Sequence, residues 1–253
     1  MALESKTAIV FGASQGIGLA TARELARQGA VVILAARSPS IHSSAEQINK
    51  QHNNKTAYAM QCDVTDYAAV KQCIDFAVEQ TGQLDIVVNN AGVIEPIVHL
   101  VDSEPSAWGK AIDINIKGVY HGVRAAAEIM KAQGHGTIIN LGSGAANSIL
   151  EGWSHYSATK AAVKKITEIA HKELHGSGVR VVGLSPGTVA TDMMEKIRQS
   201  GINPVSQLDW SQHIPPEWPA KAIIYLCSPE SDDVLGTDFS IKTEEGRARV
   251  GLI

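Results

Sequence analysis

Short runs of apolar, often β-branched residues alternate along the chain with longer segments whose apolar residues recur at helical spacing. Apolar residues occupy every position of 31–36, as expected for a strand buried on both faces of a parallel sheet. Helical stretches lie between such runs, for example at 18–28, 68–80 and 156–175. Seven strands are predicted, at 7–11, 30–36, 56–61, 84–89, 136–141, 179–184 and 238–242. This alternation predicts an α/β fold: a doubly wound, seven-stranded, mostly parallel Rossmann-type sheet with helices on both faces.

The chain shows no internal boundary. Its 253 residues suit one large α/β domain, and no linker rich in Gly, Ser or Pro divides it. We therefore expect a single domain that spans 1–253. One long irregular region, about 192–216, is rich in Pro, Ser and Gln and follows the sixth strand. A long loop in a compact domain is typically functional, so this region is predicted to be a substrate lid.

Composition and charge argue against several classes of function. The formal net charge of -4 and the pI near 6.1 provide no basic surface for nucleic acid. No stretch approaches the roughly 18 consecutive apolar residues of a membrane-spanning helix, and the first residues do not resemble a secretion signal. The three cysteines are odd in number and widely spaced, and the nine histidines lack the spacing of metal ligands. We expect a cytoplasmic protein without a disulfide framework, a metal site, or a membrane or nucleic-acid partner.

A glycine-rich turn follows the first predicted strand in the sequence FGASQGIG, which contains Gly12, Gly16 and Gly18. Glycines between a strand and a helix allow a tight turn and let backbone N–H groups approach a pyrophosphate at the helix N-terminus. The spacing is G-x-x-x-G-x-G, and at this point a purely structural turn without a ligand is an alternative.

The end of the second predicted strand distinguishes between two dinucleotides. An acidic residue there would bind the ribose hydroxyls of NAD, but the chain has Ala36 followed by Arg37. A missing carboxylate and an added guanidinium favour the 2′-phosphate of NADP, because Arg holds a phosphate with two hydrogen bonds. The hydroxyls of Ser14 and Ser38 would assist. The alternative is that Arg37 is an ordinary solvent-exposed side chain.

An acid–base pair is indicated by YSATK, in which Tyr156 and Lys160 stand four residues apart at the start of a predicted helix. This spacing places both side chains on one helix face. A phenol has an ordinary pKa near 10, and a neighbouring ammonium lowers that pKa, which makes Tyr156 usable for proton transfer near neutral pH. Standing alone, the pair would be better explained as a solvent-facing contact that has no chemical function.

Further motifs accompany this pair in a defined order. Ser143 follows the fifth strand, and Asn115 lies in NIKG within a helical stretch. NNAG ends the fourth strand, CDVT follows the third, and PGTVATDM follows the sixth. In this order and spacing, over about residues 5–242, the chain resembles the compact, single-domain branch of the short-chain dehydrogenase/reductase family. The resemblance implies an oxidoreductase that transfers a hydride between NADP(H) and a carbonyl or secondary-alcohol substrate.

The resemblance also implies a role for each matching residue. Tyr156 would be the acid/base, Lys160 would lower its pKa and bind the nicotinamide ribose, and Ser143 would hold the substrate oxygen. Asn115 would anchor a water that passes protons on through Lys160. Donors aimed at the substrate oxygen would stabilise the negative charge that develops there. The cofactor would contact Gly12, Ser14, Gln15, Gly16, Ile17, Gly18, Arg37, Ser38, Asp63, Val64, Asn90, Ala91, Gly92, Tyr156, Lys160, Pro186, Gly187, Val189 and Thr191.

Some positions depart from the family pattern. Phe11 replaces a common Thr before the first glycine, and Gln15 stands where many NADP-preferring relatives have a cation. The usual V-D-G-G ending is replaced by a segment that contains Lys242 and Glu244. In the family this ending helps to form subunit contacts and shapes the pocket. A symmetric homotetramer, or a dimer, is still expected from the resemblance.

Three alternatives stay open on the sequence. The chain is either a general carbonyl reductase or a 3-oxoacyl-thioester reductase, and a catalytically silent NADP(H)-binding regulator is the non-enzymatic alternative. The epimerase or dehydratase branch fits less well, because it usually has a longer C-terminal substrate domain. His155 is expected to be a bystander, since adjacent helix residues point in different directions. Contact with an apolar substrate, or ordinary packing, is open for Trp153, Met193, Met194, Trp210 and Trp218.

Overall fold

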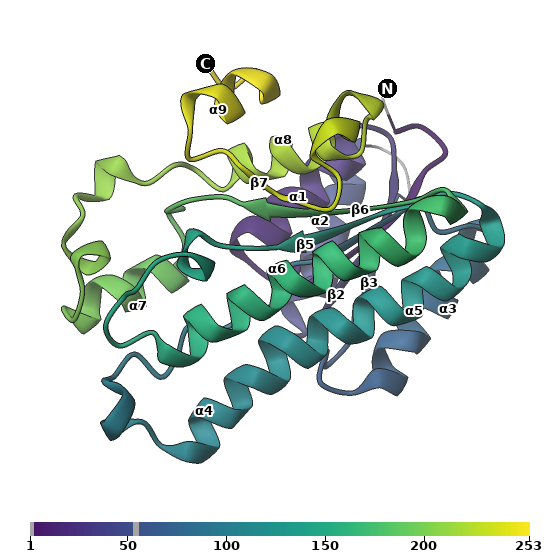
Figure 1. Ribbon diagram of the computed structural model, residues 1–253. Helices are drawn as coiled ribbons and strands as arrows, with labels where there is room; N and C mark the ends of the chain where they lie inside the picture. Colours follow the sequence, from purple (N-terminus) through teal and green to yellow (C-terminus); the bar gives the residue numbers. More distant parts are fainter. Residues whose placement is uncertain (1–2, 53–55) are drawn as a thin grey trace.

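Seven parallel strands form one sheet in the computed structural model, which describes residues 3–52 and 56–253 (Figure 1). The order across the sheet is β3-β2-β1-β4-β5-β6-β7. The predicted α/β fold is confirmed, and each of the seven strands lies where the sequence predicted it within a few residues. The strands are β1 (Thr7–Phe11), β2 (Val31–Ala36), β3 (Ala57–Gln61), β4 (Ile86–Asn89), β5 (Gly136–Leu141), β6 (Val179–Ser185) and β7 (Asp238–Ser240).

Helices cover both faces of the sheet. One core lies between the sheet and α1, α2 and α8, and a second lies between the sheet and α3, α5 and α6. Val10 of β1 enters the first core and Ile9 the second, because successive strand side chains point to opposite faces. The helices are α1 (Gly16–Arg27), α2 (Ser40–His52), α3 (Tyr67–Thr81), α4 (Pro105–Ile112), α5 (Gly118–Gln133), α6 (Ser154–Leu174), α7 (Asp192–Ser200), α8 (Glu217–Leu226) and α9 (Glu244–Val250).

The sheet order brings the ends of β1, β2 and β4 together. Phe11 of β1 is in register with Ala35 of β2 and with Asn89 of β4. The chain leaves β1 towards one face of the sheet through α1, and leaves β4 towards the other face through α4 and α5. Open α/β sheets bind ligands in the crevice at such a switch point, outside the carboxyl ends of the strands. In Figure 1 this end lies on the left, where α7 and α9 follow β6 and β7.

The region 192–216 contains more regular structure than the sequence suggested. The prediction of an irregular segment was wrong for its first nine residues, which form α7. Met194 and Ile197, three positions apart on this helix, are buried in a small third core, and this amphipathic spacing stabilises the helix. Gly201, with φ of 65°, ends α7 in the left-handed conformation that glycine adopts readily. Short 3₁₀ turns follow at Pro204–Gln207 and Trp210–Gln212.

The last strand is shorter than predicted. β7 ends at Ser240, whose hydroxyl accepts a hydrogen bond from the Lys242 N–H (3.2 Å) in the turn that leads to α9. The strand therefore ends before Lys242, and α9 follows on the side of the molecule where the carboxyl ends of the strands lie (Figure 1).

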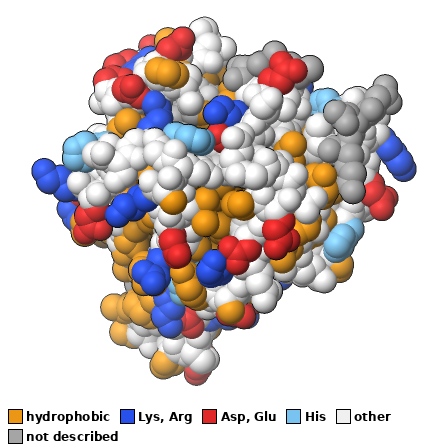
Figure 2. All heavy atoms as spheres, turned by 90° about the vertical axis from the view of Figure 1, so that its right-hand side faces the viewer, with side chains coloured by type: hydrophobic (Ala, Val, Ile, Leu, Met, Phe, Trp, Pro, Cys, Tyr) orange, Lys and Arg blue, Asp and Glu red, His pale blue; other side chains and the backbone are white. Residues whose placement is uncertain are grey.

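The opposite end of the molecule is shown in Figure 2, where positively and negatively charged side chains are interspersed with hydrophobic ones. Within 3–52 and 56–253, no helix combines the length and the apolar character that crossing a bilayer requires.

Candidate active site

Two adjoining cavities open at the carboxyl ends of the strands. The first, of about 620 Å³, is bordered by the loops that follow β1, β2, β3 and β4. The second, of about 590 Å³, lies against the end of β5, the start of α6, the loop after β6, and α7. The two cavities form one continuous crevice, because they share a wall. That wall consists of Ile17, Asn90, Gly92, Thr191 and Met193.

The glycine-rich turn forms the floor of the first cavity. Gly12 and Gly16 have φ values of 77° and 54°, a conformation that other residues adopt at a cost. A Cβ atom on Gly18 would lie 2.2 Å from the Gly12 carbonyl oxygen, so the helix can approach the turn only with glycine there. Asn90 closes the turn from β4, since its Nδ2 donates to the carbonyl oxygens of Gly12 (3.0 Å) and Phe11 (3.2 Å). Gly18 lines neither cavity and acts through this packing.

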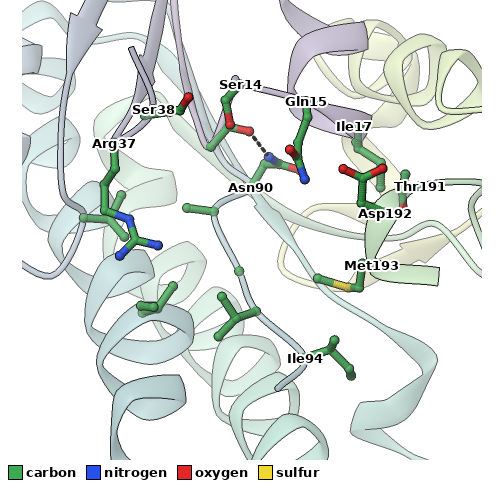
Figure 3. Close-up of a pocket in the computed structure, with 18 of the residues that line it drawn as sticks. Ser14, Gln15, Ile17, Arg37, Ser38, Asn90, Ile94, Thr191, Asp192 and Met193 are labelled. Atoms are coloured by element: carbon green, nitrogen blue, oxygen red, sulfur yellow. Dashed lines mark hydrogen bonds between the residues drawn. The ribbon is translucent and has the colours of Figure 1, made fainter. Parts of the chain in front are cut away.

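Arg37 and Ser38, which follow β2, form one side of the first cavity. Figure 3 shows these two side chains on one side of the cavity and Thr191 on the other, with Ser14 between them. Arg37 is more than half exposed, and its Nη1 lies 4.0 Å from Oδ2 of Asp63. It makes no closer ion pair in the part of the chain that the structure describes.

The carboxylate of Asp63 is held by its own loop. Its Oδ1 accepts hydrogen bonds from the backbone N–H (2.9 Å) and the hydroxyl (2.8 Å) of Thr65. Burial acts to raise the pKa of Asp63, but these hydrogen bonds and the Arg37 charge outweigh burial and lower it. Asp63 therefore stays ionised beside Arg37, and the guanidinium is oriented at the cavity wall rather than neutralised by a close contact.

The candidate acid/base lies in the second cavity. Tyr156 is in the first turn of α6 and its side chain is buried, with the ring packed edge-on against Trp153 at 5.4 Å. Ser143 follows β5 and hydrogen-bonds with the Tyr156 hydroxyl. Burial raises the pKa of Tyr156, and the hydrogen bond with Ser143 acts in the opposite direction. The phenol is thus a poor acid without a further positive charge nearby.

Lys160 supplies that charge. It lies one helical turn after Tyr156, and its Nζ is 5.7 Å from the centre of the Tyr156 ring. The Nζ donates a 2.6 Å hydrogen bond to the carbonyl oxygen of Leu141 at the end of β5. Burial lowers the pKa of Lys160 to about 8, and the carboxylate of Asp238 acts against this change.

Asp238 is a charged neighbour that the sequence analysis missed. It opens β7, opposite Gly183 of β6, and burial raises the pKa of its carboxyl to about 6. Its Oδ1 is buried without a hydrogen-bond partner among the described residues. The carboxylate occupies space that two glycines leave open, since a Cβ atom on Gly142 or Gly183 would lie 2.2 or 2.6 Å from Oδ1. The only signal of this contact in the sequence was an aspartate at the start of the last predicted strand.

Asn115 lies behind the site rather than in it. It belongs to the π-helical turn η2 (Asp113–Lys117) between α4 and α5, and it lines neither cavity. Its side-chain amide is bound to both backbone groups of Val93, accepting from the N–H (2.8 Å) and donating to the oxygen (2.9 Å). It also donates to the Thr159 hydroxyl (3.1 Å). Asn115 thereby joins the loop after β4 to α6.

The remaining predicted cofactor contacts are divided between the two cavities. Those on the first are Gly12, Ser14, Gln15, Gly16, Ile17, Arg37, Ser38, Asp63, Val64, Asn90, Ala91, Gly92 and Thr191. Those on the second are Tyr156, Lys160, Pro186, Gly187 and Val189.

The side chains whose role the sequence left open are now placed. The second cavity is lined by Trp153, Met193 and Met194 but not by Trp210 or Trp218. His155 is buried and lines neither cavity; its Nε2 lies 2.7 Å from the carbonyl oxygen of Ile94. Burial lowers the pKa of His155.

Comparison with known proteins places this geometry in context. Residues 6–201 match the family described as short chain dehydrogenase. The chain is 35% identical over 223 residues to an uncharacterised oxidoreductase of Staphylococcus haemolyticus, covering 88% of this chain and 91% of that one. It is 32% identical over 238 residues to the 3-oxoacyl-[acyl-carrier-protein] reductase of Thermotoga maritima, covering 93% and 96%. The crystal structure of levodione reductase superposes with a TM-score of 0.89 at 23% identity, covering 97% and 99%.

Proposed function

The chain belongs to the short-chain dehydrogenase family of oxidoreductases, and we propose that it interconverts a carbonyl and a secondary alcohol with NADP(H). One observation carries this proposal: Tyr156, Ser143 and Lys160 line a cavity that continues into a glycine-floored crevice. In that arrangement a substrate oxygen beside Tyr156 faces the same space as a dinucleotide laid along the glycine turn.

The proton chemistry follows from the three side chains. The Tyr156 hydroxyl donates its proton to the carbonyl oxygen as negative charge develops there, and the Ser143 hydroxyl donates a second hydrogen bond to that oxygen. Burial works against ionisation of Tyr156, so the Lys160 ammonium is needed to stabilise the phenolate that remains. In the oxidative direction the phenolate accepts the alcohol proton.

The first cavity suits a dinucleotide, because glycines at its base leave the backbone exposed. Gly12 and Gly16 turn the chain there with positive φ, and α1 presents its N-terminus to the space above them. A nicotinamide dinucleotide bound in this crevice would supply or accept the hydride. Lys160 would bind its ribose, and the segment of Pro186 and Thr191 would hold its carboxamide.

The preference for NADP(H) over NAD(H) rests on Ala36 and Arg37. Both residues border the first cavity, and no carboxylate stands at the end of β2 to repel a 2′-phosphate. The guanidinium of Arg37 is half-exposed and only 4.0 Å from Asp63, which leaves it available to a phosphate but partly screened. Ser14 and Ser38 add hydroxyl groups to the same rim.

Asn115 is proposed to brace the site and to position the proton path. A Cβ atom on Gly92 would lie 3.4 Å from the Asn115 Oδ1 and 3.9 Å from the Lys160 Nζ, so both side chains lie close to that glycine. A water held beside Asn115 would connect Lys160 with solvent, as the family resemblance implies.

The test is NADPH consumption against ketones, aldehydes, steroids, sugars and 3-oxoacyl thioesters, with Tyr156→Phe measured in parallel. Phenylalanine keeps the ring and removes the proton, so turnover should fall about 10²- to 10⁴-fold while NADPH binding is unchanged. Near-normal turnover of Tyr156→Phe would contradict the mechanism. Failure of every substrate, with intact NADPH binding, would favour the non-catalytic regulator.

Reduction of a 3-oxoacyl thioester is the second candidate. The observation that favours it is the 32% identity to the Thermotoga maritima reductase over nearly the full length of both chains. A kcat/KM for a 3-oxoacyl thioester well above that of simple ketones would select this candidate.

The proposed lid and assembly extend this function. α7 and the turns up to residue 216 are proposed to close over the second cavity, because Met193, Met194 and Ile197 form part of its wall. A two-fold symmetric oligomer through α4, α5 and α6 is proposed, supported by the exposed side chains of Tyr120 and Ile169. Light scattering that gave the mass of a monomer at micromolar concentration would contradict this assembly.

A further inference from the structure

Within the described chain, the lining of the second cavity contains positively charged side chains and no carboxylate, although Asp238 lies behind it near Lys160. Among the described residues that border it, Lys160, Lys242 and Arg247 carry positive charge, and none is Asp or Glu. Such a cavity favours a ligand that combines an apolar stem with a negative group. The apolar wall consists mainly of Leu150, Trp153, Met193, Met194, Ile197, Val205, Leu208 and Ile214.

Two of these cations have no acidic partner. Within 3–52 and 56–253, neither Lys242 nor Arg247 lies within ion-pair distance of a carboxylate. Arg249, two residues further along α9, lines neither cavity and is paired with Asp233 at 2.6 Å. The difference is therefore local: the cation that faces away from the cavity is neutralised, and the two that border it are not.

Arg247 is held in place by uncharged contacts. Its Nε donates to the carbonyl oxygen of Ile241 (3.0 Å), and its guanidinium lies over the Trp218 ring at 5.3 Å. The two terminal nitrogens make no hydrogen bond within the described chain. Such a guanidinium is oriented in advance, with its pair of donors left for a planar or tetrahedral oxyanion.

Lys242 stands beside the loop that follows β6. A Cβ atom on Gly187 would lie 3.7 Å from the Lys242 Cβ, so this lysine packs at the loop after β6. The loop, Lys242 and Arg247 all border the cavity that contains Tyr156. The two cations thus reach the substrate space from the turn after β7 and from α9, and neither of these elements carries Tyr156 or Ser143.

We propose that Lys242 and Arg247 form an anion subsite, which binds a carboxylate or phosphate group of a carbonyl substrate with an apolar stem. This inference rests on the proposed carbonyl reduction and names the substrate class. The acidic group sits at the anion subsite while the carbonyl oxygen lies at Tyr156. The turn that ends β7 creates the subsite, since it places Lys242 and α9 over the carboxyl ends of the strands.

The experiment measures kcat/KM of the NADPH-loaded enzyme for matched substrates. The probes are a series from 4-oxopentanoate to 8-oxononanoate, the methyl ester of each acid, and 5-oxohexyl phosphate. The wild type should prefer an acid of matching length over its ester by about tenfold or more, the size of a hydrogen bond to a charged group. Comparison of 5-oxohexyl phosphate with 6-oxoheptanoate decides between phosphate and carboxylate.

Two variants assign that preference to the subsite. Lys242→Met and Arg247→Met should each reduce the preference for acid over ester about tenfold, with kcat/KM for the ester and Kd for NADPH nearly unchanged. Arg247→Lys keeps the charge and should retain part of the preference. Arg249→Met removes a cation from the same helix outside the cavity, and it should leave the preference unchanged.

The outcomes separate the subsite from the proposed function. If esters are reduced as well as acids and Tyr156→Phe abolishes both reactions, the function stands and the subsite is wrong. If Lys242→Met and Arg247→Met weaken NADPH binding instead, the cations serve the cofactor and the subsite is wrong. If nothing is reduced, the proposed function fails, and calorimetry with heptanoate and heptanamide then tests the subsite. Equal binding of both compounds overturns the subsite. Selective binding of heptanoate that is abolished by Lys242→Met and by Arg247→Met supports the subsite.

Discussion

Replacing Asp238 with Asn tests the electrostatic link between β7 and Lys160. Asparagine has nearly the same shape, so it fits the space above Gly142 and Gly183 that the carboxylate occupies. The substitution removes one negative charge beside a buried ammonium. Because Asp238 raises the pKa of Lys160, its loss should lower that pKa and deprotonate Lys160 in a pH range where the wild type is still charged.

The size of the effect follows from charge attraction. Two unit charges several ångströms apart at an effective dielectric constant near 20 attract by about 2 kcal/mol. Since about 1.4 kcal/mol corresponds to a factor of ten, a change of about 2 kcal/mol alters the ratio of protonated to neutral lysine about 30-fold. Since the pKa of Lys160 is about 8, about half of it is ammonium at pH 8. A roughly 30-fold lower ratio leaves about 3 % of the lysine as ammonium, so kcat at pH 8 should fall about 15-fold.

The pH dependence gives the sign. Asp238 has a pKa of about 6 and is therefore charged above that pH, whereas Lys160, with a pKa of about 8, is charged below pH 8. Both charges are present between these values, and there the carboxylate sustains the ammonium. Below pH 6 the wild-type carboxyl is protonated, so wild type and Asp238→Asn should converge. The alkaline limb of the variant should lie at lower pH than that of the wild type.

The assay is the reductive kcat at saturating NADPH and substrate from pH 5 to pH 9, for wild type and Asp238→Asn. Asp75→Asn is the control, because it removes a surface carboxylate on α3 that pairs with Lys71; its profile should match the wild type. Circular dichroism and the unfolding midpoint establish that Asp238→Asn is folded. Coincident pH profiles for a folded Asp238→Asn would refute the electrostatic link.

Three further predictions concern the cofactor, the lid and the packing of the helices. Arg37→Ala should weaken NADPH binding about tenfold and leave NADH binding unchanged, as measured by fluorescence titration. Tenfold is the lower end for a hydrogen bond to a charged group, because Arg37 is half-exposed. Ala36→Asp should shift the preference towards NADH, and equal kcat/KM for both cofactors in the wild type would contradict the assignment. Hydrogen exchange in 192–216 should slow when NADPH binds, and an unchanged rate would argue against a lid. Gly122→Ala should lower the unfolding midpoint, although alanine favours helices. The Cβ atom of the new alanine would lie 1.9 Å from a buried asparagine side chain, and such overpacking costs about 1–3 kcal/mol. Gly109→Ala, in open space on α4, should raise stability by up to about 1 kcal/mol, and equal midpoints for the two variants would contradict the packing.

The sequence alone determined the elements whose signal is local. Short apolar runs, often β-branched, marked the seven strands; the run at 31–36 is continuous because a strand buried on both faces has no polar side to interrupt the pattern. Tyr156 and Lys160 were placed on one face of α6 by a four-residue spacing, which holds in any helix. The glycine turn after β1 was recognised because positive φ restricts which residues can stand there. Ala36 and Arg37 followed from their position at the end of β2.

Tertiary structure decided what distant segments do to one another. Asp238 lies beside Lys160 only because β7 pairs with β6, and the side chain of Asn115 is bound to Val93 rather than facing the crevice. α7 was missed because Met194 and Ile197 indicate a helix only when a core exists to bury them. Likewise, the tail after β7 departs from the family pattern, and only its turn over the strand ends brings Lys242 to the cavity. The local pattern of apolar and polar residues encodes which face of a helix or strand is apolar. The order of strands and the path of loops set which faces meet, and the free energy of that packing depends on the whole chain.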